Sequence, residues 1–126
     1  MGLDFNRVFR SSSYEARKLR RELHSWLLAA GVNGTVERDV TGAVNEAFAN
    51  AIEHPVGRAS EEIVVDGEVT DGVVVVRIRD DGVWSDDVDP DRSHYGFELM
   101  ETLMDRVEVA RGSEATIVTL RRAIVG

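Results

Sequence analysis

Two stretches of β-branched residues around a two-residue turn constrain the fold of this chain more than any other feature. Ile63–Val69 and Val73–Ile78 are rich in valine and isoleucine, and Asp71-Gly72 lies between them. An Asp-Gly pair in this position is a strong signal for a β-hairpin. Val73–Val76 is apolar at every position, which is typical of a strand covered on both sides. We therefore expect an antiparallel pair whose second strand is central in its sheet.

The other periodic segments predict helices and strands that pack against this hairpin. Apolar residues at three- and four-residue spacing predict helices from Ser13, as N-cap, to Gly31, over 35–54 and over 96–104. Alternating segments predict a short first strand at 3–9 and a last hairpin at 107–120. The acidic segment 83–95 contains Pro90 and shows no periodicity, so we expect a long loop there. This order predicts an α+β, two-layer fold, with the helices on one face of a mixed, mostly antiparallel sheet.

The composition limits the classes of protein to which the chain can belong. With 126 residues there is enough chain for one hydrophobic core, so we expect a single domain over 1–126. The net charge of −8 disfavours direct binding to nucleic acid, and the lack of cysteine removes disulfides and thiolate chemistry. The sequence contains no apolar run long enough for a membrane span and no signal peptide. We therefore expect a cytoplasmic protein without membrane contact.

The predicted helix at 35–54 carries a polar stripe beside its apolar one. Glu46, Asn50 and His54 are four residues apart and lie on one side of the helix. Asparagine is a poor helix former, so Asn50 among small apolar residues needs a reason. Its amide oxygen could bind Mg²⁺ together with the phosphates of a nucleotide, and Glu46 could act as a general base. The alternative is that the three residues form a solvated helix face.

Other polar groups also allow both a functional and a structural interpretation. Asp80–Gly82 could end a strand at a binding site or form a simple hairpin turn. The basic residues within 17–21 could dock an acidic partner or form a solvated face. The spacing of Asp87–Glu98 resembles a calcium-binding EF-hand loop, but its sixth position is arginine instead of glycine. His24 lacks the usual context of a phosphoacceptor histidine, which argues against a sensor histidine kinase.

Three motifs follow one another in a fixed order along the chain. They are Asn45–His54 (NEAFANAIEH), Arg79–Gly82 (RDDG) and Gly96–Met100 (GFELM). In this order they resemble the GHKL ATPase fold, and within it the anti-sigma-factor serine kinases of the RsbW type. The resemblance covers nearly the whole chain, and Trp84 and the closing Leu103–Val107 are also similar to this family. It implies a two-layer α/β sandwich of the Bergerat type.

The resemblance also implies a role for individual residues in binding ATP and Mg²⁺. Glu46 would activate the hydroxyl of a protein substrate, and Asn50 would coordinate Mg²⁺ at the nucleotide. Asp80 would accept a hydrogen bond from the adenine amino group, while Gly82 would let the base approach the backbone. In this family these groups together form one nucleotide site.

Two further residues complete the implied site, and the chain departs from the family beside both. Gly96, at a helix N-terminus, would present amide groups to phosphate, and Thr116 matches a family threonine near adenine. A richer pattern of glycine and arginine is usual where this chain has Ser93–Tyr95, and Ala115 stands where glycine is usual. The segment 86–92 is acidic, and like charges near a nucleotide reduce affinity unless Mg²⁺ offsets them.

Two functions follow from these features. The resemblance implies an anti-sigma factor, expected to be a homodimer, that sequesters a sigma factor and phosphorylates a serine of a STAS-type anti-sigma-factor antagonist. The alternative is a binding module with a degenerate nucleotide pocket, either alone or as a domain of a larger regulator. Glu46, Asn50 and Asp80 favour the enzyme, because a pure binding module has no chemical need of them.

Overall fold

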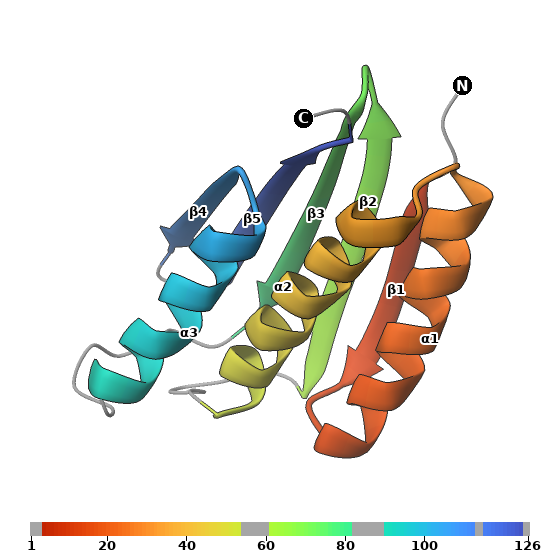
Figure 1. Ribbon diagram of the computed structural model, residues 1–126. Helices are drawn as coiled ribbons and strands as arrows, with labels where there is room; N and C mark the ends of the chain where they lie inside the picture. The colour runs from red at the N-terminus through yellow and green to blue at the C-terminus, as the bar shows by residue number, and fades with distance from the viewer. Residues whose placement is uncertain (1–3, 54–60, 82–89, 113–114, 125–126) are drawn as a thin grey trace.

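The computed structural model describes residues 4–53, 61–81, 90–112 and 115–124 and folds them into two layers (Figure 1). One layer is a five-stranded sheet, and the helices of the other layer all cover the same face of it. The predicted α+β fold is confirmed, and every pairing between the described strands is antiparallel. The elements are β1 (Phe5–Arg10), α1 (Ser13–Ala29), α2 (Gly34–Glu53), β2 (Glu62–Thr70), β3 (Val73–Asp80), α3 (Pro90–Leu103), β4 (Arg106–Arg111) and β5 (Thr116–Ala123).

The β2–β3 hairpin forms the centre of the sheet, as its sequence predicts. The strand order is β1-β2-β3-β5-β4, so β3 has a neighbour on each side. Asp71 and Gly72 have φ angles of 53° and 75°, the left-handed values that a tight two-residue hairpin turn requires. Val76 and Ile78 alternate toward the helices and are buried. β3 therefore runs beneath the helix layer from this turn to its end at Asp80.

The core lies between the sheet and the helices. Phe9 of β1 meets Phe48 of α2 edge-on, with ring centroids 5.9 Å apart. Phe5 of β1 packs against Trp26 of α1, with ring centroids 5.3 Å apart. α2 is the central helix, in contact with β3 and β5 beneath it and with α1 and α3 beside it. Among the helices that the structure describes, none combines the length and the apolar character needed to cross a bilayer.

The three described helices begin at residues other than those predicted, α2 by only about one residue. The N-cap of α1 is Ser12, whose hydroxyl accepts a hydrogen bond from the amide of Tyr14 (3.2 Å), so Ser13 is the first helical residue instead of the cap. α3 begins at Pro90, and the loop predicted over 83–95 is therefore wrong from residue 90 onward. Proline suits a first helical position because its fixed φ is helical and its missing N–H has no partner there.

Candidate functional site

Two polar residues lie opposite each other at one end of the sheet, where the buried apolar rows stop. Asp80 ends β3 and Thr116 begins β5, and the register of the two strands pairs them directly. Both residues are 1% exposed. The alternation of the strands turns them toward the helices, as it does the next inward pair, Ile78 and Val118. A carboxylate and a hydroxyl are therefore buried together beneath the helix layer.

The course of α2 brings Asn50 to the same end of the sheet. Near the start of α2, Asp39 accepts a hydrogen bond from Arg122 near the end of β5 (3.1 Å), so the helix and the strand run in opposite directions. Asn50 lies about 16 Å further along the helix than Asp39, and Thr116 lies about 20 Å back along the strand from Arg122. The end of α2 and the end of β3 accordingly both lie toward the bottom of Figure 1.

The amide of Asn50 has hydrogen-bonding capacity that the described residues do not use. Asn50 is 5% exposed, and its Nδ2 atom is buried without a hydrogen-bond partner in the described part of the chain. A polar group buried in this way carries a free-energy cost that a bound ligand would remove. The amide can also turn over, which exchanges its nitrogen and oxygen. The side chain of Asn50 can therefore bind a ligand in two ways. Its oxygen can coordinate a cation, or its nitrogen can donate a hydrogen bond to a phosphate.

Glu46 lies one turn before Asn50 on α2, on the side that faces α3. Gly42 marks this side, because a Cβ added to it would lie 3.1 Å from Cδ1 of Leu103 in α3. Glu46 itself is half-buried, so part of its side chain remains accessible to a second molecule. Residues four apart on a helix are neighbours on its surface. Glu46 and Asn50 are therefore neighbours on the surface of α2.

Of the two glycines predicted for the site, the structure describes the backbone of Gly96 but not that of Gly82. Gly96 lies inside α3, which begins at Pro90, so the prediction that it stands at a helix N-terminus is wrong. Within a helix the amide N–H bonds to the carbonyl four residues earlier, and it is not available to phosphate as a terminal N–H is. Gly82 lies outside the described residues, as does His54.

The structure removes two of the alternatives raised by the sequence. In the described part of the chain, β3 pairs with β2 on one side and with β5 on the other, which leaves no free edge of β3 for a strand that would follow Asp80 in a hairpin. The EF-hand interpretation of Asp87–Glu98 fails because the chain is helical from Pro90 onward, where that motif needs a loop.

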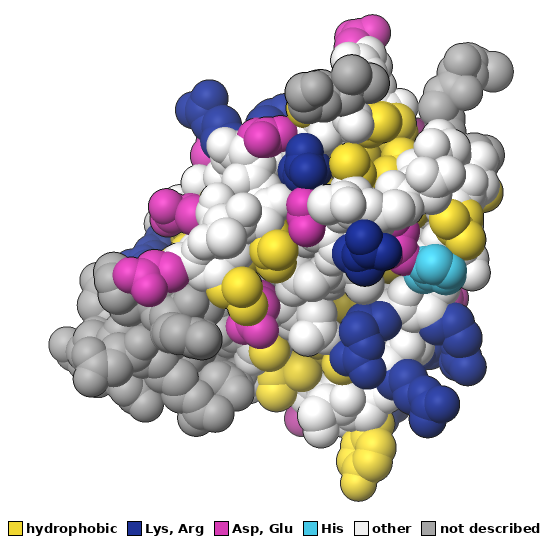
Figure 2. All heavy atoms as spheres, viewed as in Figure 1, with side chains coloured by type: hydrophobic (Ala, Val, Ile, Leu, Met, Phe, Trp, Pro, Cys, Tyr) yellow, Lys and Arg dark blue, Asp and Glu magenta, His cyan; other side chains and the backbone are white. Residues whose placement is uncertain are grey.

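The side of α2 that faces α1 carries contacts that the sequence did not indicate. Arg20 donates a hydrogen bond to Oδ1 of Asn45 (2.8 Å), and Nδ1 of His24 contacts the buried carboxylate of Glu37. Figure 2 shows Lys and Arg side chains gathered over the N-terminal half of α1, where the basic residues of 17–21 are exposed. Of this basic group, Arg20 therefore also has a structural role, because it joins α1 to the helix that carries Glu46.

Comparison with known proteins identifies the family of this chain. The model of the histidine kinase-like ATPase domain matches residues 9–122, which is nearly the whole chain. The chain belongs to this family, which confirms the resemblance drawn from its three sequence motifs.

Within the family, the chain is similar to proteins named anti-sigma F factor. It is 34% identical to that of Clostridium novyi over 84 residues, which cover 56% of this chain and 59% of the relative. It is 32% identical to that of Geobacillus stearothermophilus over 103 residues, 68% of each protein. The chain thus spans about three fifths of the length of the Clostridium relative.

Solved structures share the architecture. The structure of the RsbU and RsbW domains of Rv1364c from Mycobacterium tuberculosis superposes with a TM-score of 0.80 and 25% identity, covering 97% of this chain and 32% of that chain. A histidine kinase domain from the Erythrobacter litoralis blue-light activated histidine kinase superposes with a TM-score of 0.57 and 24% identity, covering 71% of this chain and 45% of that chain. The second match concerns the fold alone.

Proposed function

We propose that this chain is an ATP-dependent anti-sigma factor with protein serine kinase activity. The observation that carries the proposal is the group of Asp80, Thr116 and Asn50 buried at one end of the sheet in a histidine kinase-like ATPase domain. The similarity to anti-sigma F factors supports a sigma factor as the partner. The similarity to an RsbW domain also supports a regulatory role. The phosphoryl acceptor would be a serine of a STAS-type antagonist, as the resemblance of the sequence motifs implies.

Asp80 and Thr116 would bind the adenine of ATP. An ionised carboxylate is a hydrogen-bond acceptor, so Asp80 would accept a hydrogen bond from the exocyclic amino group of adenine. The hydroxyl of Thr116 can donate to a ring nitrogen of the same base. Both residues are buried, so a base that lacks the matching groups would be desolvated at the site without gaining these two hydrogen bonds, and the site would favour adenine over it.

Asn50 and Glu46 would act near the phosphates. Mg²⁺, when bound, supplies charge neutralisation to the phosphate oxygens, and the amide oxygen of Asn50 would hold it. Glu46 would take the proton of the substrate serine as the serine oxygen bonds to the γ-phosphorus and the bond to the β-phosphate oxygen breaks. The half-buried position of Glu46 suits this role, because a protein substrate must reach its carboxylate.

The variant Asp80→Asn tests the nucleotide site. It replaces a charged group with two acceptor oxygens by a neutral amide with one acceptor oxygen and one NH₂ donor, which weakens the hydrogen bond from adenine, so we expect ATP affinity to fall by more than about tenfold. Isothermal titration with ATP, with and without Mg²⁺, measures the change. Asp81→Asn is the matched control, since it removes the same charge from the next residue, whose carboxylate lies 3.9 Å from Arg79. Unchanged affinity in Asp80→Asn, or no ATP binding by the unmodified protein, would contradict the proposed site.

The variant Glu46→Gln separates phosphoryl transfer from nucleotide binding. Glutamine keeps the size of the side chain but cannot take up the serine proton, so we expect transfer to fall by about 100-fold or more while ATP affinity changes by less than about twofold. Transfer of labelled phosphate from ATP to a STAS-type antagonist measures the rate. Glu101→Gln, on the exposed side of α3, is the control and should leave transfer unchanged. Transfer at the unmodified rate in Glu46→Gln would exclude Glu46 as the base.

Partner binding without phosphoryl transfer is a second candidate function, and the course of α3 favours it. Gly96 lies within this helix, so its amide is not presented to phosphate as a helix N-terminus would present it. Under this function the chain would sequester its partner through its surface alone. The unmodified protein would then bind no ATP, and Asp80→Asn and Glu46→Gln would both keep full affinity for the sigma factor.

A further inference from the structure

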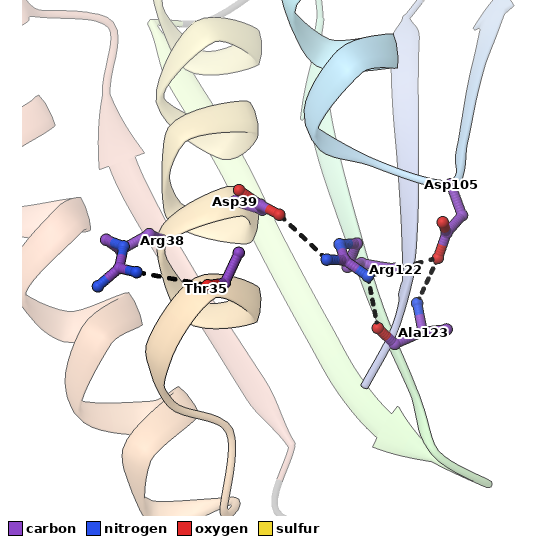
Figure 3. Close-up of polar contacts among 6 residues, drawn as sticks. All are labelled: Thr35, Arg38, Asp39, Asp105, Arg122 and Ala123. Carbon is purple, nitrogen blue, oxygen red and sulfur yellow. Dashed lines mark hydrogen bonds and ion pairs between the residues drawn. The ribbon is translucent and has the colours of Figure 1, made fainter. Parts of the chain in front are cut away.

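One arginine ties three elements together at the end of the molecule opposite the candidate site. Arg122 of β5 donates a hydrogen bond to Oδ2 of Asp39 in α2 (3.1 Å) and lies 3.9 Å from Oδ2 of Asp105, between α3 and β4 (Figure 3). The arginine side chain is 18% exposed, and that of Asp39 is 22% exposed. These three residues, Asp39, Asp105 and Arg122, form what we call the Arg122 clasp.

Further hydrogen bonds fix the same corner. Oδ2 of Asp105 accepts a hydrogen bond from the amide of Ala123 (2.6 Å), and the amide of Asp105 donates to the carbonyl of Arg121 (2.9 Å). Nη1 of Arg122 donates to the carbonyl of Ala123 (2.8 Å). Asp105, the second residue after the end of α3, is thereby attached to the end of β5 through both its backbone and its side chain. Besides pairing with each other, the charged groups of the clasp therefore form hydrogen bonds with the backbone at the end of β5.

Each element that meets at the clasp also leads to the candidate site. α2 carries Glu46 and Asn50, and β5 begins with Thr116. α3 runs from the site end of the molecule to the clasp (Figure 1). There, a Cβ added to Gly42 of α2 would lie 3.1 Å from Cδ1 of Leu103. Rigid secondary elements transmit a displacement from one end to the other. A change of geometry at the clasp would therefore move the groups at the site.

We propose that Arg122 is a positioning residue for the nucleotide site, an inference that rests on the proposed function. The arginine fixes the register of α2 against β5, which sets Asn50 against Thr116, and it fixes the angle between α3 and α2. Without its guanidinium, the carboxylates of Asp39 and Asp105 would lose the positive charge between them. The side chain of Asp39 is only 22% exposed, so salt screens its charge weakly, whereas that of Asp105 is 58% exposed. The main effect would therefore be at Asp39, which would keep a partly buried charge without its partner, and the start of α2 would shift from the end of β5.

The variant Arg122→Met tests this role, because it removes the charge and keeps much of the aliphatic side chain. We expect ATP affinity measured by titration to fall by about 5- to 20-fold, as for coupling between separate sites. We also expect amide hydrogen exchange to become faster in residues 35–45 and 97–103, which border the clasp. A purely structural arginine would lower the urea midpoint of unfolding and leave the ATP affinity of the folded protein unchanged. That result would overturn the proposal.

Three further variants separate the clasp from general destabilisation. Arg122→Lys keeps the positive charge but offers one ammonium group in place of the two guanidinium nitrogens, so it should lose clearly less ATP affinity than Arg122→Met. Asp39→Asn removes the partner on α2 and should weaken ATP binding as Arg122→Met does. Arg106→Met removes an arginine that is 69% exposed and pairs with Glu108 (2.7 Å), so it should change neither readout. Equal losses in the lysine and methionine variants would contradict a role that depends on the charge.

The positioning role and the proposed function can fail separately. If the unmodified protein binds ATP and Arg122→Met binds it equally well, the proposed function stands and the positioning role is overturned. If the unmodified protein binds no ATP, the proposed function fails and the positioning role falls with it. In that case hydrogen exchange would still decide whether the clasp holds α3 against α2.

Discussion

Gly67 illustrates how the packing of a neighbouring helix determines a single residue. It lies in β2, opposite Phe5 of β1 and Val76 of β3. A Cβ at this position would lie 2.8 Å from Cη2 and 3.1 Å from Cζ3 of Trp26, closer than a side chain can approach without a shift. A glycine inside a strand often marks a place where another group comes close to the backbone. Here that group is the indole ring of α1.

The variant Gly67→Ala should therefore destabilise the fold. The added methyl group must displace Trp26, and overpacking of this kind costs about 1–3 kcal/mol in the free energy of unfolding. Urea unfolding followed by tryptophan fluorescence measures the loss. Glu68→Ala changes the next residue of the same strand, whose side chain is 44% exposed, and should have a much smaller effect. An unchanged midpoint for Gly67→Ala would mean that the indole moves aside without cost.

The residues of the candidate site differ in how well the sequence could predict them. Asn50 was singled out as a polar residue in the middle of an apolar helical segment and Asp80 as the residue that ends an apolar strand, and both are buried. The direct pairing of Asp80 with Thr116 depends on the register between β3 and β5, which no local pattern specifies. The contact between Asp39 and Arg122 joins residues 83 positions apart, so the spacing of neighbouring residues could not reveal it. Single polar residues in an unusual local context could be identified from the sequence, whereas contacts between residues far apart in the chain could not.

At the scale of elements, the strongest predictions concern segments whose local signals agree with their tertiary environment. The β2–β3 hairpin has β-branched strands and a turn with two positive φ angles, so its residues favour the observed conformation without help from other elements. α2 likewise combines a continuous apolar stripe with contacts on three sides, and its predicted bounds differ by about one residue from those observed.

α3 shows the opposite case, in which a local signal was misleading. Pro90 and the polar residues after it predict a loop, because proline usually interrupts a helix and polar residues give no apolar period. Proline is nevertheless favourable as the first residue of a helix, where α3 places it. The apolar period appears only from Phe97 onward, in the part of α3 that packs near the core. The sequence therefore predicted the packed half of this helix and missed its first turns.

At the scale of the whole molecule, the two faces of the sheet have different chemistry. The helices cover one face (Figure 1), and the other carries charged side chains, some of which pair across β2 and β3. Arg77 of β3 lies 3.4 Å from Asp66 and 3.9 Å from Glu68 of β2, for example. Cross-strand pairs of opposite charge stabilise a sheet modestly and make its open face compatible with water. Along the covered face, the candidate site and the Arg122 clasp occupy opposite ends of the same elements.

Because α2, β3 and β5 all contribute to the candidate site, ATP should stabilise the domain as a whole. A ligand that binds only the folded state adds about 2.7 kcal/mol to the free energy of unfolding at 100 times its Kd, which raises the Tm of a 126-residue domain by about 10 °C. Thermal unfolding followed by circular dichroism measures the shift. Inorganic tripolyphosphate should give a much smaller shift, because it lacks adenine and the net charge of −8 disfavours a polyanion. Asp80→Asn should abolish most of the effect of ATP. Equal shifts with tripolyphosphate and ATP would show that phosphate binding alone stabilises the fold, and would contradict adenine recognition by Asp80.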